Sequence, residues 1–160
     1  MNQKRLELIK SRLTDFEIEF SDINGTPAII TNPENIIIIC SILKSEPDIS
    51  FEMLLDVMGV DNFKKENRFE VVCSLYSLEF RDRIFIKISL DTKNPEMPSL
   101  TAIWKGANWF ERETYDMLGI KFKGHPDLRR IYMPEEYEHY PLRKDFPLLG
   151  IPESLQLPKK

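Results

Sequence analysis

Prolines recur through the last part of the chain, from residue 121 to residue 160, too often for regular secondary structure. They stand at positions 126, 134, 141, 147, 152 and 158. Because each proline fixes φ and removes a backbone donor, this spacing excludes long helices and central strands. The same segment carries apolar and aromatic residues that a disordered tail would lack, among them Phe122, Ile131, Tyr132, Tyr140 and Phe146. We therefore predict an extended arm, residues 121–160, that packs on the surface of a partner. Folding back onto its own domain is the alternative, and the two are compatible.

The remaining residues, 1–120, are expected to form one globular domain. The whole chain is 42% hydrophobic and 30% charged, and its 160 residues suit a single core. No apolar run approaches the roughly 20 residues of a membrane span, and the N-terminus lacks the apolar core of an export signal, so we expect a protein that stays inside the cell. A formal net charge of −4 argues against binding nucleic acid through bulk positive charge.

Local patterns predict both helices and strands within this domain. The helical spacing of Leu6, Ile9 and Leu13 indicates a first helix over residues 3–13, and Asn24-Gly25 between two apolar stretches indicates a β-hairpin. The other expected elements are a helix over residues 31–44, a short helix over residues 51–58, a hairpin of strands 68–78 and 83–90, and a helix from Ser99 to Leu118 that stops at Gly119. Gly106 is expected to bend or interrupt this last helix, whose regular part would then begin at Ala107.

Glu111 interrupts the apolar face of that last helix. Positions 104, 107, 111, 115 and 118 step by three or four along one ridge. A buried carboxylate needs a cationic or donor partner or must stay protonated, since an unpaired buried charge costs several kcal/mol. The basic residues of the arm are the nearest cations in the sequence, so we predict that Glu111 ties the helix to the arm. The alternative places Glu111 at the edge of the stripe, with its carboxylate in water.

Trp109 lies on the opposite, charged face of the helix, beside Arg112, Glu113 and Asp116. An indole on a charged face is a candidate to fill a pocket of a partner protein, although a lone surface aromatic residue is the simpler alternative. Arg112 and Asp116 are spaced i, i+4 and are expected to form an ordinary surface ion pair. Glu111 and Glu113 point about 200° apart, at roughly 100° per residue, so they cannot work together as an acid–base pair.

Two clusters in the arm alternate charged with apolar residues: Leu128-Arg129-Arg130-Ile131 and Leu142-Arg143-Lys144-Asp145-Phe146. An extended segment of this kind can bury alternate side chains in a groove, while its guanidinium groups bind carboxylates through two hydrogen bonds. We expect Arg129, Arg130 and Arg143 to be paired. Lys144 is expected to keep its charge in water.

The sequence offers little for catalysis or metal binding. It contains none of the glycine-rich nucleotide-binding motifs, no zinc-protease His-Glu-x-x-His motif and no Gly-x-Ser-x-Gly motif of hydrolases. Cys40 and Cys73 lie in apolar stretches and are expected to be buried thiols, because an iron–sulfur cluster takes about four cysteines. His125 precedes a proline and is interpreted as a turn residue with a hydrogen-bonded ring. Metal binding with Asp127 and the nearby glutamates is the alternative.

Three motifs together resemble one known family. They are Asn108-Trp109-Phe110-Glu111-Arg112-Glu113-Thr114-Tyr115-Asp116-Met117-Leu118-Gly119, then Gly124-His125-Pro126 with Arg129-Arg130, and Pro141-Leu142-Arg143-Lys144-Asp145. The family is the C subunit, also called the thirty-kilodalton subunit, of proton-pumping NADH:quinone oxidoreductase, respiratory complex I. The resemblance extends over nearly the whole chain, and its specific part is the Glu-Arg-Glu run with the later His-Pro and Leu-Arg-Lys-Asp. Lys105-Gly106 departs from the family, in which many members have a proline.

The resemblance implies an α+β fold: a single domain with a mixed β-sheet flanked by helices, followed by the proline-rich arm. It also implies a non-redox structural subunit in the peripheral part of the complex, on the cytoplasmic side of the cell inner membrane and bound to the membrane only through the complex. The expected partners are subunits B, D and I. FMN, iron–sulfur clusters and quinone are expected in the assembly, and none of them on this chain.

The residues expected at interfaces come from the three motifs: Trp109, Glu111, Arg112, Glu113, Asp116, His125, Arg129, Arg130, Leu142, Arg143, Lys144 and Asp145. Two other functions remain open. A homologous subunit of a membrane-bound hydrogenase, or of a ferredoxin-dependent quinone oxidoreductase, would resemble the same family. A stand-alone small enzyme using His125 and the acidic residues would need no partners.

Overall fold

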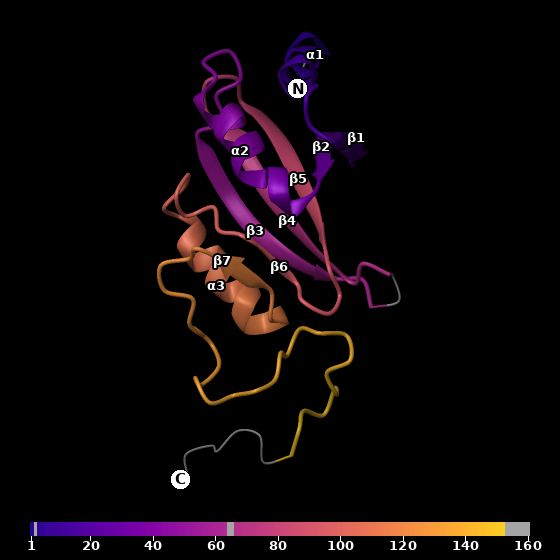
Figure 1. Cartoon of the computed structure of the whole chain (residues 1–160), viewed down its shortest axis with the longest axis vertical. Helices are drawn as coiled ribbons and strands as arrows, with labels where there is room; N and C mark the ends of the chain where they lie inside the picture. Colours follow the sequence, from indigo (N-terminus) through magenta and orange to yellow (C-terminus); the bar gives the residue numbers. More distant parts are fainter. Residues whose placement is uncertain (2, 64–65, 153–160) are drawn as a thin grey trace.

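A five-stranded mixed β-sheet forms the centre of the molecule in the computed structural model, which describes residues 1, 3–63 and 66–152 (Figure 1). Across the sheet the strands are β1 (Ile18–Ile23), β2 (Thr26–Thr31), β5 (Asp82–Leu90), β4 (Phe69–Ser77) and β3 (Met53–Asp61). β2 and β5 run parallel, and the other neighbours are antiparallel. The mixed sheet and the α+β class implied by the family resemblance are therefore confirmed.

The core lies between one face of this sheet and the helices α1 (Gln3–Arg12), α2 (Ile36–Ser45) and α3 (Ala107–Leu118). Buried and half-buried residues alternate along the central strands, as expected when one face is covered. The covered face carries Phe69, Val71, Cys73 and Leu75 of β4 and Ile84, Ile86 and Ile88 of β5. In Figure 1, α2 crosses in front of the strands and α3 lies next to β3.

Both β-hairpins predicted from the sequence are present. In the first turn Asn24 and Gly25 have positive φ values of 52° and 83°, the geometry of a two-residue type I′ turn. In the second, β4 and β5 pair from Phe69 opposite Leu90 to Ser77 opposite Asp82. The first helix is also present as predicted.

The predicted helix over residues 31–44 is present with a tighter first turn. Pro33–Asn35 form the 3-10 turn η1, and α2 continues from Ile36 to Ser45. Pro33 suits the start of a helix because its missing N–H would have no partner there. The buried residues Ile36, Ile39, Cys40 and Leu43 recur at helical spacing and face the core.

The short helix predicted over residues 51–58 is wrong, because most of this segment belongs to strand β3. Pairing with β4 runs from Met53 opposite Tyr76 to Asp61 opposite Phe69. The register shifts between Leu54 and Asp56, which is a β-bulge or a comparable irregularity. A bulge breaks the period of two along a strand, so the apolar residues resembled a helical pattern instead.

Helix α3 begins at Ala107 and not at Ser99, since residues 101–103 and 105–106 form turns and Gly106 is the N-cap. The predicted interruption at Gly106 and the predicted stop at Gly119 are confirmed, and Gly119 takes a left-handed φ of 76°. On the facing strand β3, a Cβ at Gly59 would lie 2.8 Å from Thr114 Cγ2 and would also overlap Leu118. The lack of a side chain at Gly59 therefore allows the helix to lie close to the sheet.

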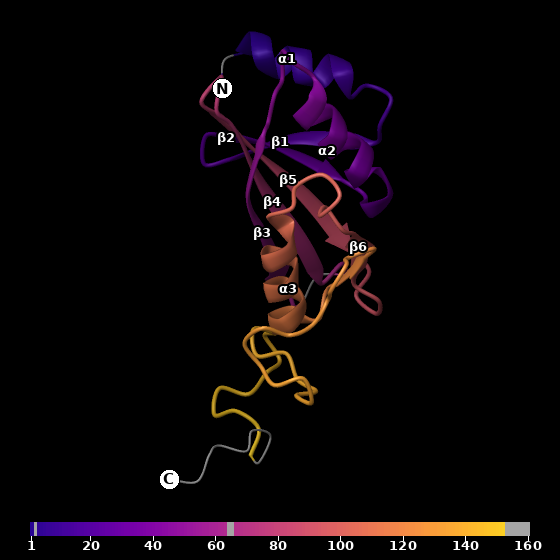
Figure 2. The same ribbon diagram turned by 90° about the vertical axis from the view of Figure 1, so that its left-hand side faces the viewer.

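Regular structure extends slightly into the segment predicted as the arm. β7 (Lys121–Lys123) pairs in parallel with β6 (Glu96–Pro98). From Gly124 to Pro152 the chain is irregular and extends away from α1 (Figure 2). Within the described residues, no helix is long and apolar enough to span a membrane.

Candidate functional site

The three sequence motifs come together where helix α3 meets the arm. Among the described residues, three sets of contacts hold residues 129–145 of the arm against the domain. We name each set after the residue at its centre: the Asp116, Leu118 and Asp61 anchors. The alternative in which the arm folds back onto its own domain is therefore observed for this part of the chain.

The Asp116 anchor binds the middle of the arm. Asp116 is fully buried. Its Oδ1 accepts a hydrogen bond from Arg130 Nη1 at 2.7 Å, and its Oδ2 accepts three backbone N–H groups, from Ile131, Tyr132 and Met133, at 3.0, 2.7 and 3.1 Å. Burial alone would raise the pKa of Asp116, but these donors together lower it below the ordinary value. The carboxylate is ionised and serves as a fixed point for the arm.

Arg112 belongs to the same region but does not pair with Asp116. Its Nε and Nη2 donate to the backbone oxygens of Arg129 and Arg130 at 3.1 and 3.3 Å, and its guanidinium lies 4.8 Å from the centre of the Trp109 ring. The predicted surface ion pair of Arg112 and Asp116 is therefore wrong. The arm covers this face of α3 and supplies the partners of both residues, which are buried.

The Leu118 anchor covers the C-terminal end of α3. Arg143 Nε donates to the Leu118 oxygen at 2.7 Å, and the Leu142 N–H donates to the Met117 oxygen at 3.1 Å. The arm thus satisfies carbonyl groups that lack partners at a helix end. A Cβ at Gly119 would lie 2.5 Å from Arg143 Nη2 and 2.7 Å from the Tyr140 ring, so glycine is needed for both its φ and its size.

The Asp61 anchor holds the end of the third motif. Arg68 binds Asp61 through Nε and Nη2 at 2.8 and 2.7 Å, and binds Asp145 through Nη1 and Nη2 at 2.9 and 2.8 Å. The Lys144 N–H donates to Asp61 Oδ2 at 2.8 Å. Hydrogen bonds from Arg68 hold the pKa of Asp61 far below its ordinary value, against the effect of burial. The Lys144 side chain is exposed, as predicted.

Arg68 and Asp61 also belong to this site, although none of the three sequence motifs contains them. Asp61 ends β3 and Arg68 immediately precedes β4, so opposite charges meet across the end of an antiparallel pair. A signal existed in the sequence, because oppositely charged residues at facing strand ends commonly pair. The prediction of a helix at residues 51–58 concealed it.

Glu111 is fully buried, which excludes the alternative that its carboxylate lies in water. Its Oε2 accepts a hydrogen bond from Ser99 Oγ at 2.7 Å, and its Oε1 accepts the Leu100 N–H at 2.6 Å. The prediction that an arm cation pairs with Glu111 is wrong, because Arg130 and Arg143 bind at the other anchors. Burial raises the pKa of Glu111 to about 7, although the two hydrogen bonds act in the opposite direction.

His125 is a turn residue with a hydrogen-bonded ring, as predicted. Its Nε2 lies 3.2 Å from the Asn108 oxygen, and its Nδ1 accepts the Asp127 N–H at 3.0 Å. These partners correspond to the neutral ring with its proton on Nε2. The ring is fully buried, 4.0 Å from Glu111 Oε2. Within the described part of the chain, no group of three metal-ligating side chains occurs.

The outer surface of this region, which we call the α3–arm surface, is defined by Trp109, Tyr132 and Leu142. These large apolar side chains are 63%, 63% and 61% exposed. Glu113 and Arg129 are also exposed, and Arg129 Nε pairs with Asp127 at 3.0 Å. The α3–arm surface therefore combines exposed anchoring side chains with a backbone that the three anchors fix.

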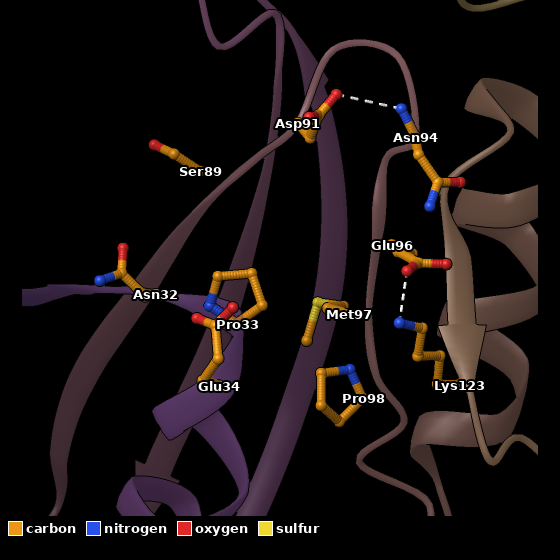
Figure 3. A pocket seen from close by; sticks show the side chains of 10 residues that line it. All are labelled: Asn32, Pro33, Glu34, Ser89, Asp91, Asn94, Glu96, Met97, Pro98 and Lys123. Atoms are coloured by element: carbon orange, nitrogen blue, oxygen red, sulfur yellow. Dashed lines mark hydrogen bonds and ion pairs between the residues drawn. The ribbon is translucent and has the colours of Figure 1, made fainter.

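A separate groove of about 630 Å³ contains none of the motif residues (Figure 3). In it Glu96 pairs with Lys123, and Asp91 Oδ1 accepts the Asn94 N–H at 3.1 Å. It is lined by Asn32, Pro33, Glu34, Ser89, Asp91, Asn94, Glu96, Met97, Pro98 and Lys123. None of these lining residues is a histidine or a cysteine, and Glu96 is engaged by Lys123.

One known protein family matches most of the chain, including α3 and the three anchors. The family described as respiratory-chain NADH dehydrogenase, 30 Kd subunit, matches residues 29–151. The chain belongs to this family. Relatives in the 30 Kd subunit family include the C subunit of the NADH-quinone oxidoreductase of Roseiflexus sp. (strain RS-1), which is 44% identical over 92% of this chain and 84% of the relative. The C 2 subunit of the same oxidoreductase in Rhizobium etli (strain CIAT 652) is 46% identical over 92% of this chain and 78% of the relative.

Solved structures related to the 30 Kd subunit family share the fold. A trypsin-resistant fragment of Nqo5 matches with a TM-score of 0.65 and 32% identity, covering 78% of this chain and 99% of the fragment. A chain of the membrane-bound sulfane sulfur reductase, an archaeal respiratory membrane complex, matches with a TM-score of 0.76 and 25% identity, covering 92% of this chain and 88% of that one. The relatives are subunits of larger complexes, so the partners of this chain are other subunits.

Proposed function

We propose that this chain is the non-redox structural C subunit of an NADH-quinone oxidoreductase. Its role is to hold neighbouring subunits around the quinone-reducing module. The observation that carries this proposal is the α3–arm surface, where Trp109, Tyr132 and Leu142 are exposed on a backbone fixed by three anchors. Large side chains on a preordered backbone are the usual energetic anchors of protein interfaces.

The cysteines support the assignment of redox chemistry to other subunits. Cys40 and Cys73 are both buried, and burial raises the pKa of each thiol above its ordinary value. Two protonated thiols are a poor donor set for an iron–sulfur cluster, which uses about four thiolates. We therefore assign FMN, the iron–sulfur clusters and the quinone to other subunits, with subunits B, D and I as the partners. The complex would hold this chain peripherally on the cytoplasmic side of the inner membrane.

An assembly experiment in the host tests this proposal. Replacing both Trp109 and Tyr132 by alanine should leave the isolated chain folded, but should reduce the amount of assembled complex on native gels and the NADH:quinone activity of membranes. Leu78→Ala is the matched control, since Leu78 is 59% exposed on the β4–β5 turn, away from the α3–arm surface. Normal assembly with both aromatic residues removed would refute the proposed interface.

The fold match to the membrane-bound sulfane sulfur reductase favours a second candidate, a structural subunit of a related respiratory complex with another electron donor or acceptor. Co-purification of the tagged chain from its host, followed by mass spectrometry, distinguishes the two. A flavin-bearing NADH module among the partners supports the NADH-quinone oxidoreductase. A nickel-bearing large subunit supports a membrane-bound hydrogenase.

The structure argues against a stand-alone enzyme based on His125. The ring is fully buried, and its two nitrogens contact the Asn108 oxygen and the Asp127 N–H. A general base must reach the proton that it removes, and this ring is not open to a substrate. Turnover of NADH with a quinone by the purified chain alone would contradict the structural role.

A further inference from the structure

Glu111 is a fully buried carboxyl group, and among the described residues no lysine or arginine pairs with it. Its hydrogen bonds come from the Ser99 hydroxyl and the Leu100 N–H. The ion-pair contact recorded for it in the described part of the chain is His125, at 4.0 Å, and the proton on His125 Nε2 is directed to the Asn108 oxygen. Such a carboxyl group is free to exist in either protonation state if its neighbours can adapt to both.

The groups packed around Glu111 do not fix it in the ionised state. On its own helix, the neighbouring Arg112 is directed away, to the carbonyl oxygens of Arg129 and Arg130. From the sheet comes the thiol of Cys73, whose pKa is raised by burial and raised further by the charge of Glu111. From the turn after β7 comes His125. The titratable groups that reach Glu111 from the sheet and from the turn after β7 are thus a thiol and a neutral ring.

The loop before α3 provides the adaptable neighbours, in a chain of two hydroxyl groups. Ser99 Oγ lies 2.7 Å from Glu111 Oε2 and 2.7 Å from Thr101 Oγ1, and either hydroxyl can be the donor in the second contact. The Thr101 N–H also donates to Ser99 Oγ, at 3.2 Å. Ser99 is buried, whereas Thr101 is half-buried. The hydroxyl chain therefore leads from the sealed carboxyl group toward the surface.

Reversing this chain satisfies both protonation states without moving the backbone. When Glu111 is ionised, Thr101 donates to Ser99 and Ser99 donates to the carboxylate. When Glu111 is protonated, its O–H donates to Ser99 Oγ and Ser99 donates to Thr101. A hydroxyl group has one donor and two acceptor positions, so both arrangements fit its capacity.

We propose that Glu111, Ser99 and Thr101 form a buried proton-exchange site that takes up and releases one proton through the hydroxyl chain. On release, the Glu111 proton passes to Ser99 Oγ, the Ser99 proton passes to Thr101 Oγ1, and the Thr101 proton leaves to water; uptake is the reverse. This site goes beyond the structural role proposed above, since a scaffold needs no group that titrates inside its core. The elevated pKa of Glu111, about 7, agrees with this geometry.

Infrared spectroscopy of the full purified chain tests this site through the carbonyl stretch of a protonated carboxylic acid. Ordinary carboxyl groups are mostly ionised throughout the range from about pH 5 to about pH 9. Within this range, one such band should disappear as the pH rises, with a midpoint near 7. The band should be absent from Glu111→Gln, whose amide mimics the protonated acid. It should persist with a neutral midpoint in His125→Gln, which removes the titratable ring but keeps a side-chain N–H.

Two hydroxyl variants test the path. Ser99→Ala removes the side-chain donor to the ionised carboxylate and should raise the midpoint. Thr101→Val removes the acceptor for Ser99 in the protonated state, while the Thr101 N–H is retained, and should lower it. The proposal is overturned if no carboxylic acid band titrates near neutral pH, or if the band survives in Glu111→Gln. A midpoint that fails to rise in Ser99→Ala, or fails to fall in Thr101→Val, overturns the hydroxyl path.

Discussion

Glu111 and Asp116 show two ways in which one helix can bury a carboxyl group. Both side chains are fully inaccessible. Asp116 receives three backbone N–H groups and a guanidinium group, and its pKa lies below the ordinary value. Glu111 receives one hydroxyl and one N–H, and its pKa rises to about 7. The number and charge of the donors decide which carboxyl group stays ionised.

The pKa of Glu111 predicts how stability depends on pH. Because the folded-state pKa is raised from 4.5 to about 7, the folded state binds the proton more tightly than the unfolded state. The proton on Glu111 stabilises the folded state fully at pH values below the unfolded-state pKa. This stabilisation, about 3 kcal/mol in total, is lost as the pH rises from the unfolded-state pKa through the folded-state pKa. The free energy of unfolding in urea, measured at several pH values, should therefore fall less steeply with pH in Glu111→Gln.

Glu113→Gln is the matched control, because Glu113 is exposed on the same helix. It should reproduce the pH dependence of the unchanged chain. Equal slopes for Glu111→Gln and the unchanged chain would show that Glu111 titrates at an ordinary pKa.

Gly119 and Gly124 separate a steric effect from a backbone effect. Both have positive φ, 76° and 80°, but of these two glycines Gly119 is the one at which an added Cβ would meet neighbours within 4 Å. Gly124→Ala should cost about 1 kcal/mol through backbone strain, whereas Gly119→Ala should cost about 2 kcal/mol more, since it also displaces Arg143 and Tyr140. Thermal unfolding of the two variants measures the difference. Equal losses would indicate that the arm does not lie against Gly119.

At the scale of elements, the Asp61 anchor combines a buried and an exposed ion pair on one guanidinium group. The side chain of Asp61 is 1% exposed and that of Asp145 is 50% exposed. Removing Arg68 leaves Asp61 without its main partner, so Arg68→Ala should lower the free energy of unfolding by about 3 kcal/mol. Asp145→Asn should lower it by less than about 1 kcal/mol, because the exposed pair is screened by water.

Urea unfolding measures both losses, and hydrogen exchange locates them. In Arg68→Ala, the amide of Lys144 should lose protection, because its acceptor Asp61 is no longer held in place. If Asp145→Asn lowered the free energy of unfolding as much as Arg68→Ala does, the exposed Arg68–Asp145 pair would contribute most of the stability of the Asp61 anchor.

Sequence patterns predicted local features well and the partners of charged residues poorly. The Asn24-Gly25 turn and the stop at Gly119 depend on the residues themselves, and both were predicted correctly. Strand β3 was missed because an irregularity between Leu54 and Asp56 breaks its alternation. For the site, helical periodicity predicts that Glu111 is buried. Whether Ser99 or an arm arginine is its hydrogen-bond partner depends on how the loop before α3 folds. Helical periodicity contains no information of that kind.

For the whole molecule, the anchors predict that the arm depends on the domain more than the domain depends on the arm. A chain ending at Lys123 keeps the sheet and α3, so it should remain folded by circular dichroism but lose several kcal/mol of stability, since Asp116 and Leu118 lose their arm contacts. It should also fail to restore complex assembly in the host. A chain ending at Pro152 keeps all three anchors and is the control. Assembly restored by the shorter chain would show that the arm is dispensable.

The Asp61 anchor also determines when the arm can be seated. The bond from the Lys144 N–H to Asp61 spans 83 residues, and Arg68 orients that carboxylate from the start of the next strand. During synthesis, β3 and β4 leave the ribosome long before residue 144, and domains fold largely as they emerge. A sheet paired in the wrong register would not bring Asp61 and Arg68 together. The Asp61 anchor therefore forms only where β3 and β4 pair in the observed register, so hydrogen-exchange protection of the Lys144 amide reports on completion of the sheet.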